Sequence, residues 1–179
     1  MVSRRPASLP LEQRITTWRS VMSLKRLTAA LILAAAAAAA AAGNIAPRDG
    51  WAVHETSKPY GQLINDVKAA AKAEGMGVVT QAGPTEAAAA RGITIPGNRV
   101  IGLFNNDFAV KILALSTAAM IEAPVRIYVT EEEDGSATLA YKLPSHVFAP
   151  YTEEGGAELK ALADQLDRRF ARIAERAEK

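Results

Sequence analysis

Few side chains in this sequence are of types that catalyse reactions or bind metals, and the histidines are the first candidates. His54 and His146 are the only histidines in 179 residues, and the chain has no cysteine. Histidines can bind a metal ion or a haem iron, so His54 and His146 are the candidate metal ligands. Two ligands are few for a tight site, and a lone histidine is more often a surface residue. The missing cysteines exclude disulfides, thiolate nucleophiles and iron–sulfur clusters.

The serines do not lie in the sequence motif that is common in serine hydrolases. A catalytic triad needs a serine activated by a histidine and a carboxylate, and a common setting for the serine is a Gly-x-Ser-x-Gly turn. None of the serines in the expected domain lies in such a turn: Ser57, Ser116, Ser136 and Ser145. The glycines also lack the spacing of phosphate-binding loops. The question of catalysis stays open, and the sequence favours a protein that is not an enzyme.

A polar run, Asn105-Asn106-Asp107, lies where an apolar stretch meets an expected helix. Free backbone N–H groups at a helix N-terminus suit an anion, so these three residues are candidates for a small ligand-binding pocket. Asparagine and aspartate are also preferred helix caps, because their side chains accept hydrogen bonds from the same N–H groups. Capping is the favoured interpretation, and anion binding is the alternative.

A second candidate surface lies on an expected hairpin, because two strand-like stretches flank Asp134-Gly135. Arg126 and Tyr128 alternate with apolar residues and therefore face away from them, whereas Tyr141 could share a face with either group. Arginine and tyrosine are enriched in interfaces. Arg126, Tyr128 and Tyr141 are therefore candidates for binding a small acidic or aromatic ligand, or a second copy of the chain. An ordinary exposed sheet face with a cross-strand pair is the alternative.

The elements that must position these residues follow from the periodicity of the apolar residues. Alternating or continuous apolar stretches predict five strands: residues 51–57, 76–82, 99–104, 124–133 and 136–143. Helical spacing, with prolines in first turns and glycines at ends, predicts four helices: residues 59–75, 84–92, 105–123 and 157–179. Pro144, Pro150 and Gly155-Gly156 predict a loop before the last helix, which is amphipathic.

Together these elements predict an α+β fold. The expected architecture is a single two-layer domain with a mixed β-sheet of about five strands backed by helices, in the order β-α-β-α-β-α-β-β-α. The domain covers residues 51–179 and follows a linker over residues 43–50. A chain of about 137 residues from Gly43 onward is long enough to form a hydrophobic core without disulfides.

Two stretches carry a resemblance to a known family: AAAARGITIPGNRVIGLFNNDFA and AAMIEAPVRIYVTEEEDGSATLAYKLPSHVFAPY. Their ordered features resemble the domain-of-unknown-function family 302 over residues 51–151. The positions that carry the resemblance are Gly92, Pro96, Asn105, Ala123-Pro124, Asp134-Gly135, Tyr141 and Pro144. The resemblance implies a compact α/β domain that tends to form homodimers, and it implies no established reaction. A histidine and cysteines that many relatives carry are missing here, so no metal or redox role carries over from them.

The N-terminal 42 residues have the parts of an export signal. Lys25 and Arg26 precede an apolar run over residues 27–42, which ends in small residues before Gly43. A basic region, a short apolar region and small residues at the cleavage position are typical of a secretory signal peptide. The alternatives are an uncleaved anchor and an alanine-rich core helix, but 16 residues are short of the ~20 that a membrane helix needs. Met22 is an alternative start to Met1.

The charge balance depends on whether these residues are removed. The whole chain has a formal charge of +2, but six of its 21 basic residues and one of its 19 acidic residues lie in the first 42. The remaining 15 basic and 18 acidic residues give a net charge of −3 and leave no basic stripe for nucleic acid. We therefore expect no nucleic-acid partner and a protein that is soluble after cleavage.

The sequence predicts an exported, periplasmic or extracellular binding or accessory domain that is not catalytic and acts as a homodimer. No cofactor is expected, and the small-molecule or protein partner is left unidentified. The alternative is a metal- or haem-binding redox accessory protein that uses His54, His146 or both.

Overall fold

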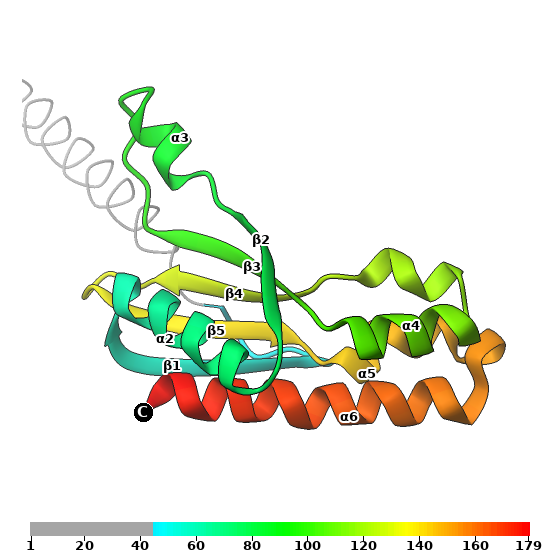
Figure 1. Cartoon of the computed structure of the whole chain (residues 1–179). Coiled ribbons are helices and arrows are strands. Elements are labelled where there is room, and N and C mark those ends of the chain that lie inside the picture. Colours follow the sequence, from blue (N-terminus) through cyan, green and yellow to red (C-terminus); the bar gives the residue numbers. More distant parts are fainter. Residues whose placement is uncertain (1–44) are drawn as a thin grey trace, which may run out of the picture. The chain divides into compact units, whose positions relative to one another are not determined.

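The computed structural model describes residues 45–179, so the predicted signal peptide and the cleavage position before Gly43 lie outside the described residues. Five strands form one sheet in the order β1-β5-β4-β3-β2, and every neighbouring pair is antiparallel (Figure 1). The strands are β1 (Trp51–Pro59), β2 (Gly77–Ala82), β3 (Asn98–Phe104), β4 (Val125–Glu131) and β5 (Ser136–Lys142).

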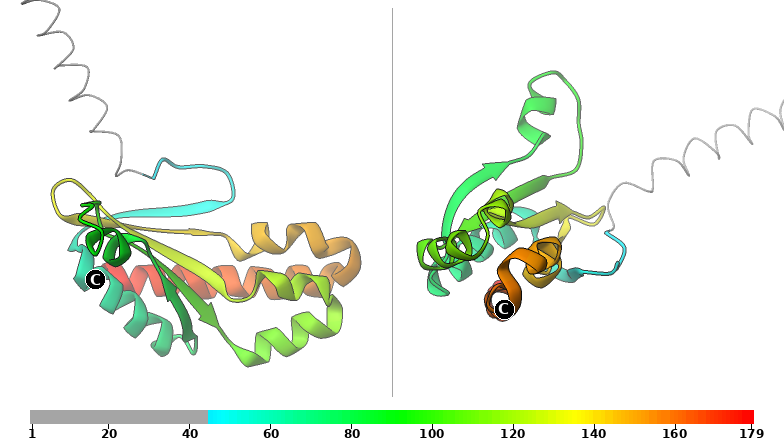
Figure 2. Two further views of the ribbon diagram at one scale, coloured as in Figure 1. Left: turned by 90° about the horizontal axis from the view of Figure 1, so that it is seen from above. Right: turned by 90° about the vertical axis from the view of Figure 1, so that its right-hand side faces the viewer.

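The helices are α2 (Tyr60–Ala73), α3 (Thr85–Ala89), α4 (Asn106–Leu115), α5 (Pro144–Phe148) and α6 (Thr152–Glu178), with short 3₁₀ helices η1 (Ala118–Glu122) and η2 (Ala149–Tyr151). Helices α2 and α6 lie side by side on one face of the sheet, while β2, α3 and β3 form an arm that rises on the other side (Figures 1 and 2). No helix within residues 45–179 combines the length and apolar character needed to cross a membrane.

The apolar residues of the strands and those of the helices form one hydrophobic core. Ile127 and Val129 of β4 are fully buried against the helix layer, and so are Leu63 of α2 and Phe170 of α6. Burying a side chain of this size contributes about 1.5–3 kcal/mol. The apolar residues of α2 and α6 therefore form one core with this face of the sheet.

An ion cluster fixes the end of α2 against α6. The carboxylate of Glu74 accepts hydrogen bonds from Nε of Arg172 and Nε of Arg176, both at 2.7 Å, and its side chain is only 9% exposed. The bond from Arg172 is the largest cause of the lowered pKa of Glu74, and burial opposes it. Two charge-assisted bonds to one carboxylate give the helix pair a defined register.

The predicted α+β fold, with one two-layer domain of five strands and helices on the sheet, is confirmed. The sheet is antiparallel throughout and not mixed. Helix α2 connects β1 to β2, but these two strands lie at opposite edges of the sheet, so this crossover creates no parallel neighbours.

Two expected elements differ from the structure. Residues 105–123 are not one helix, because Ser116 is extended (φ −153°, ψ 116°) between α4 and η1, and its hydroxyl accepts a hydrogen bond from the N–H of Ala119 at 3.1 Å. The expected loop between Pro144 and Gly156 is largely helical, since Pro144 lies in the first turn of α5, where a missing N–H costs little. Gly156 adopts φ 60° and kinks the start of α6.

Gly83 gives a test of how closely the arm packs. A methyl group at Gly83 would overlap the backbone oxygen of Asn98, which is part of the neighbouring strand. We expect Gly83→Ala to lower the free energy of unfolding by about 1–3 kcal/mol, measured by urea denaturation. Gly61→Ala is the matched control, because no atom lies within 4 Å of the added carbon. It should leave stability unchanged or raise it by up to about 1 kcal/mol. Equal effects at the two positions would contradict the close approach.

Candidate functional site

The face of the sheet opposite α2 and α6, here called the open face, carries the candidate site. Side chains alternate along each strand, so the pairing register decides which residues share this face. The register places these residues on it: Trp51, Val53 and Glu55 of β1; Thr80 and Ala82 of β2; Asn98, Val100 and Gly102 of β3; Arg126, Tyr128 and Thr130 of β4; and Thr138, Ala140 and Lys142 of β5. Arg126 and Tyr128 therefore share one face, as the hairpin pattern predicted.

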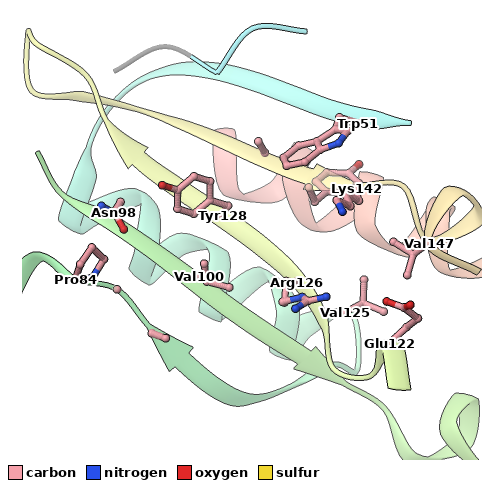
Figure 3. A pocket seen from close by; sticks show the side chains of 14 residues that line it. Trp51, Pro84, Asn98, Val100, Glu122, Val125, Arg126, Tyr128, Lys142 and Val147 are labelled. Carbon is pink, nitrogen blue, oxygen red and sulfur yellow. The ribbon is translucent and has the colours of Figure 1, made fainter. Parts of the chain in front are cut away.

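A groove of about 730 Å³ runs along the open face (Figure 3). Arg126 and Lys142 lie toward one end of it, and Tyr128, Asn98 and Pro84 lie toward the other. The arm supplies one wall through residues 82–84, and Trp51 of the edge strand lies on the opposite side. This volume is within the range of about 300–1,000 Å³ that is typical of small-molecule sites.

Small residues beside large ones create the hollow. Tyr128 pairs with Ala140 on one side and with Val100 on the other, and Arg126 pairs with Gly102. Gly102 has no room for a side chain, because a Cβ there would overlap the Thr80 hydroxyl and the Pro124 ring. The Tyr128 ring and the Arg126 guanidinium thus extend farther from the sheet than the smaller side chains beside them.

The groove has a cationic end. Among the ion pairs between described residues, none includes Arg126 or Lys142. Lys142 Nζ lies 5.8 Å from the centroid of the Trp51 ring, a cation–π distance. The carboxylate that borders this end, Glu122, already accepts a hydrogen bond from the Tyr151 hydroxyl at 2.8 Å. That bond is the main cause of the raised pKa of Tyr151.

Tyr141 lies on the other face of the sheet. It pairs with Ile127 and is 3% exposed, with its ring centroid 5.4 Å from that of Phe170 and 6.0 Å from that of His54. Burial, followed by the negative charges of nearby carboxylates, raises the pKa of Tyr141 to about 12. Tyr141 therefore borders the groove that Arg126 and Tyr128 line, but its ring lies in the core on the other face of the sheet.

Asn105 is the N-cap of α4. Its Oδ1 accepts a hydrogen bond from the N–H of Phe108 at 3.1 Å, and its Nδ2 donates one to the carbonyl of Gly75 at 2.8 Å. Both ends of the amide are thus used within the chain, to hold the start of α4 against the turn after α2. Asn106 and Asp107 follow in the first turn of α4, where both are exposed. None of the three lines the groove.

The two histidines lie in different surroundings. Nδ1 of His54 is 2.5 Å from a carboxylate oxygen of Glu178, and its ring stacks on Tyr141 beneath the sheet. The ring of His146, a residue of α5, lies against Gly50, where a Cβ would overlap it. The two rings therefore contact different residues. Within residues 45–179, no group of three or more metal-binding side chains converges.

Comparisons with known proteins identify the family and agree with the fold. The family model "Domain of unknown function DUF302" matches residues 52–177. The chain belongs to this family. A solved structure described as an uncharacterized conserved protein DUF302 from Bacillus stearothermophilus is similar in fold, with a TM-score of 0.64 and 19% sequence identity over 73% of this chain and 99% of that one. A search of curated proteins finds no match.

The groove of this DUF302 domain contains residues that the sequence did not single out, notably Trp51, Lys142 and Val100. The alternation along residues 51–57 already placed Trp51 on one side of its strand. No sequence signal indicated which side would be left without helices, because that depends on where α2 and α6 pack. The strand order was also required to bring Trp51 of β1 beside Lys142 of β5.

The burial of Tyr141 makes the free energy of unfolding of the DUF302 domain depend on pH in the alkaline range. The unfolded chain loses this proton near pH 10 and the folded chain near pH 12, so the stabilisation is fully present below pH 10 and is lost as the pH rises toward 12. We expect Tyr141→Phe to reduce the fall in the free energy of unfolding between pH 10 and 11.5, by an amount on the order of 1–2 kcal/mol. Urea denaturation at several pH values measures this change in the free energy of unfolding. Tyr128→Phe is the control, and equal slopes in both variants would contradict the burial of Tyr141.

Proposed function

We propose that this DUF302 protein is an exported binding or accessory domain that catalyses no reaction, acts as a homodimer and uses the groove of the open face as its binding surface. The observation that carries the proposal is the groove itself, in which aromatic and cationic side chains stand beside small ones on a rigid sheet. Residues held on strands are positioned more precisely than residues on loops, which favours a preformed site.

The side chains of the groove suit binding better than acid–base chemistry. Tyr128, Arg126 and Trp51 are of the types enriched where proteins bind partners. None of the described residues that line the groove is a histidine, and its carboxylate, Glu122, is hydrogen-bonded to Tyr151. A general acid and base in hydrogen-bond reach of one reacting group would be needed for proton transfer. These observations support a binding role.

The homodimer is supported by the contrast between the two sheet edges. β1 carries His54, Glu55, Lys58 and Pro59, which are residues that discourage edge-to-edge pairing. β2 reads GVVTQA, without a charge or a proline, and Val79 is 54% exposed on it. An antiparallel pair of identical edge strands satisfies two-fold symmetry, so a second copy of β2 is a suitable partner for this edge. Export is supported by Lys25-Arg26 and the apolar run that follows, which lie outside the described residues.

A neutral fluorescent probe tests the groove as a binding surface. N-phenyl-1-naphthylamine should bind the native protein with a micromolar Kd, measured by its fluorescence. Ala82→Phe adds a ring to the wall of the groove at an exposed position of β2 and should weaken binding at least about tenfold, a change of 1.4 kcal/mol. Ala69→Phe makes the same change at an exposed position of α2, on the other side of the sheet, and should leave binding unaltered. No binding, or equal loss in both variants, would refute the groove as the binding surface.

Native mass spectrometry of protein expressed with its full N-terminus tests export and assembly together. We expect the exported fraction to begin at Gly43 and to have the mass of a dimer without added mass. Val79→Lys should convert the dimer to a monomer, because a lysine on an edge strand opposes pairing. Val110→Lys on α4 is the control, since Val110 is similarly exposed at 58%. An unprocessed chain would contradict export, a monomeric native protein would contradict the dimer, and bound haem or metal would support the redox alternative.

A further inference from the structure

The ends of the groove differ in chemistry, and this difference indicates what it binds. The β4–β5 pairing ends at Ile127 and Tyr141, and the next residue on each strand, Arg126 and Lys142, faces the open side and lines the groove. Figure 3 shows both near one end of the groove. Two cations side by side repel each other, and neither forms an ion pair with a carboxylate of residues 45–179. An anion bound between them would relieve that repulsion.

The rest of the groove is suited to a flat apolar body. The ring of Tyr128 lies between Ala140 and Val100, and Pro84 of the arm lies across from it (Figure 3). Aromatic rings prefer offset or edge-to-face contact with another ring, and such a pair contributes about 0.5–1.5 kcal/mol beyond the area it buries. A volume of about 730 Å³ admits a molecule of two or three fused rings but not a folded domain.

Resting on the proposed binding function, we infer that the groove binds a small aromatic carboxylate. The carboxylate lies between the guanidinium of Arg126 and the ammonium of Lys142, and the ring system extends along Tyr128 and Val100 toward the arm. Arginine binds a carboxylate through two parallel N–H donors, and bonds of this charged kind are about twice as strong as neutral ones. Glu122 at the same end holds one carboxylate oxygen in a hydrogen bond from the Tyr151 hydroxyl, and it forms no ion pair with either cation.

The test compares 2-naphthoate with 2-naphthamide, which share a ring system and differ in charge. Isothermal titration calorimetry at low salt should show naphthoate binding about tenfold more tightly or better. In Arg126→Gln with Lys142→Gln, the ratio of the two Kd values should fall to near one. Lys68→Gln with Lys72→Gln removes the same charge from α2 on the other side of the sheet and is the matched control, which should keep the ratio. Thermal melting checks that each variant folds.

The outcomes separate this inference from the function on which it rests. If the neutral probe binds in the groove but naphthoate and naphthamide bind equally, the carboxylate preference is overturned and the binding function stands. The carboxylate preference is also overturned if the α2 variant loses it as fully as the groove variant, since net charge alone would then explain it. If neither the neutral probe nor either naphthalene compound binds, both are overturned, and a groove filled by a second copy of the chain accounts for the result.

Discussion

The packing of α2 and α6 on one side of the sheet determines the rest of this structure. Leu159, Leu166, Phe170 and Ile173 of α6 are buried in the same core as the inward-facing residues of the strands, and α2 lies beside α6. Two helices provide enough apolar surface to cover one face of a five-stranded sheet, and the chain has no further long helix among residues 45–179 to cover the other. The open face follows from this one-sided packing, since antiparallel sheets can leave one face to water.

The open face can remain uncovered because its strands place polar or small side chains on it. On β4 the buried residues Ile127 and Val129 alternate with Arg126 and Tyr128, and on β5 the small residues Ala140 and Thr138 are themselves buried among larger side chains. The groove therefore does not weaken the core, because the strand residues that shape it alternate with residues that pack on the helices.

Polar contacts at the ends of elements keep the arm and the helices in place around this sheet. Asn105 connects the cap of α4 to the turn after α2, Ser116 turns the chain between α4 and η1, and Glu74 binds two arginines of α6. Each contact joins residues that are far apart in sequence or at a change of direction. The arginines that pair with Glu74 are 47% and 56% exposed, and ion pairs with partners this exposed contribute about 1 kcal/mol or less, so they fix geometry more than they add free energy.

The amino-acid sequence by itself determined the elements with strong local signals. It indicated the five strands, the hairpin at Asp134-Gly135, the cap at Asn105, the amphipathic helix α6 and the family, since each depends on periodicity or on a few neighbouring residues. Only the tertiary structure decided the antiparallel order of the sheet, the helical turns between Pro144 and Gly156, and the separation of Tyr141 from Tyr128. It also decided that Trp51 and Lys142 meet across β1 and β5. The physical reason is that alternation divides a strand into two faces, whereas which face is buried depends on where distant helices pack.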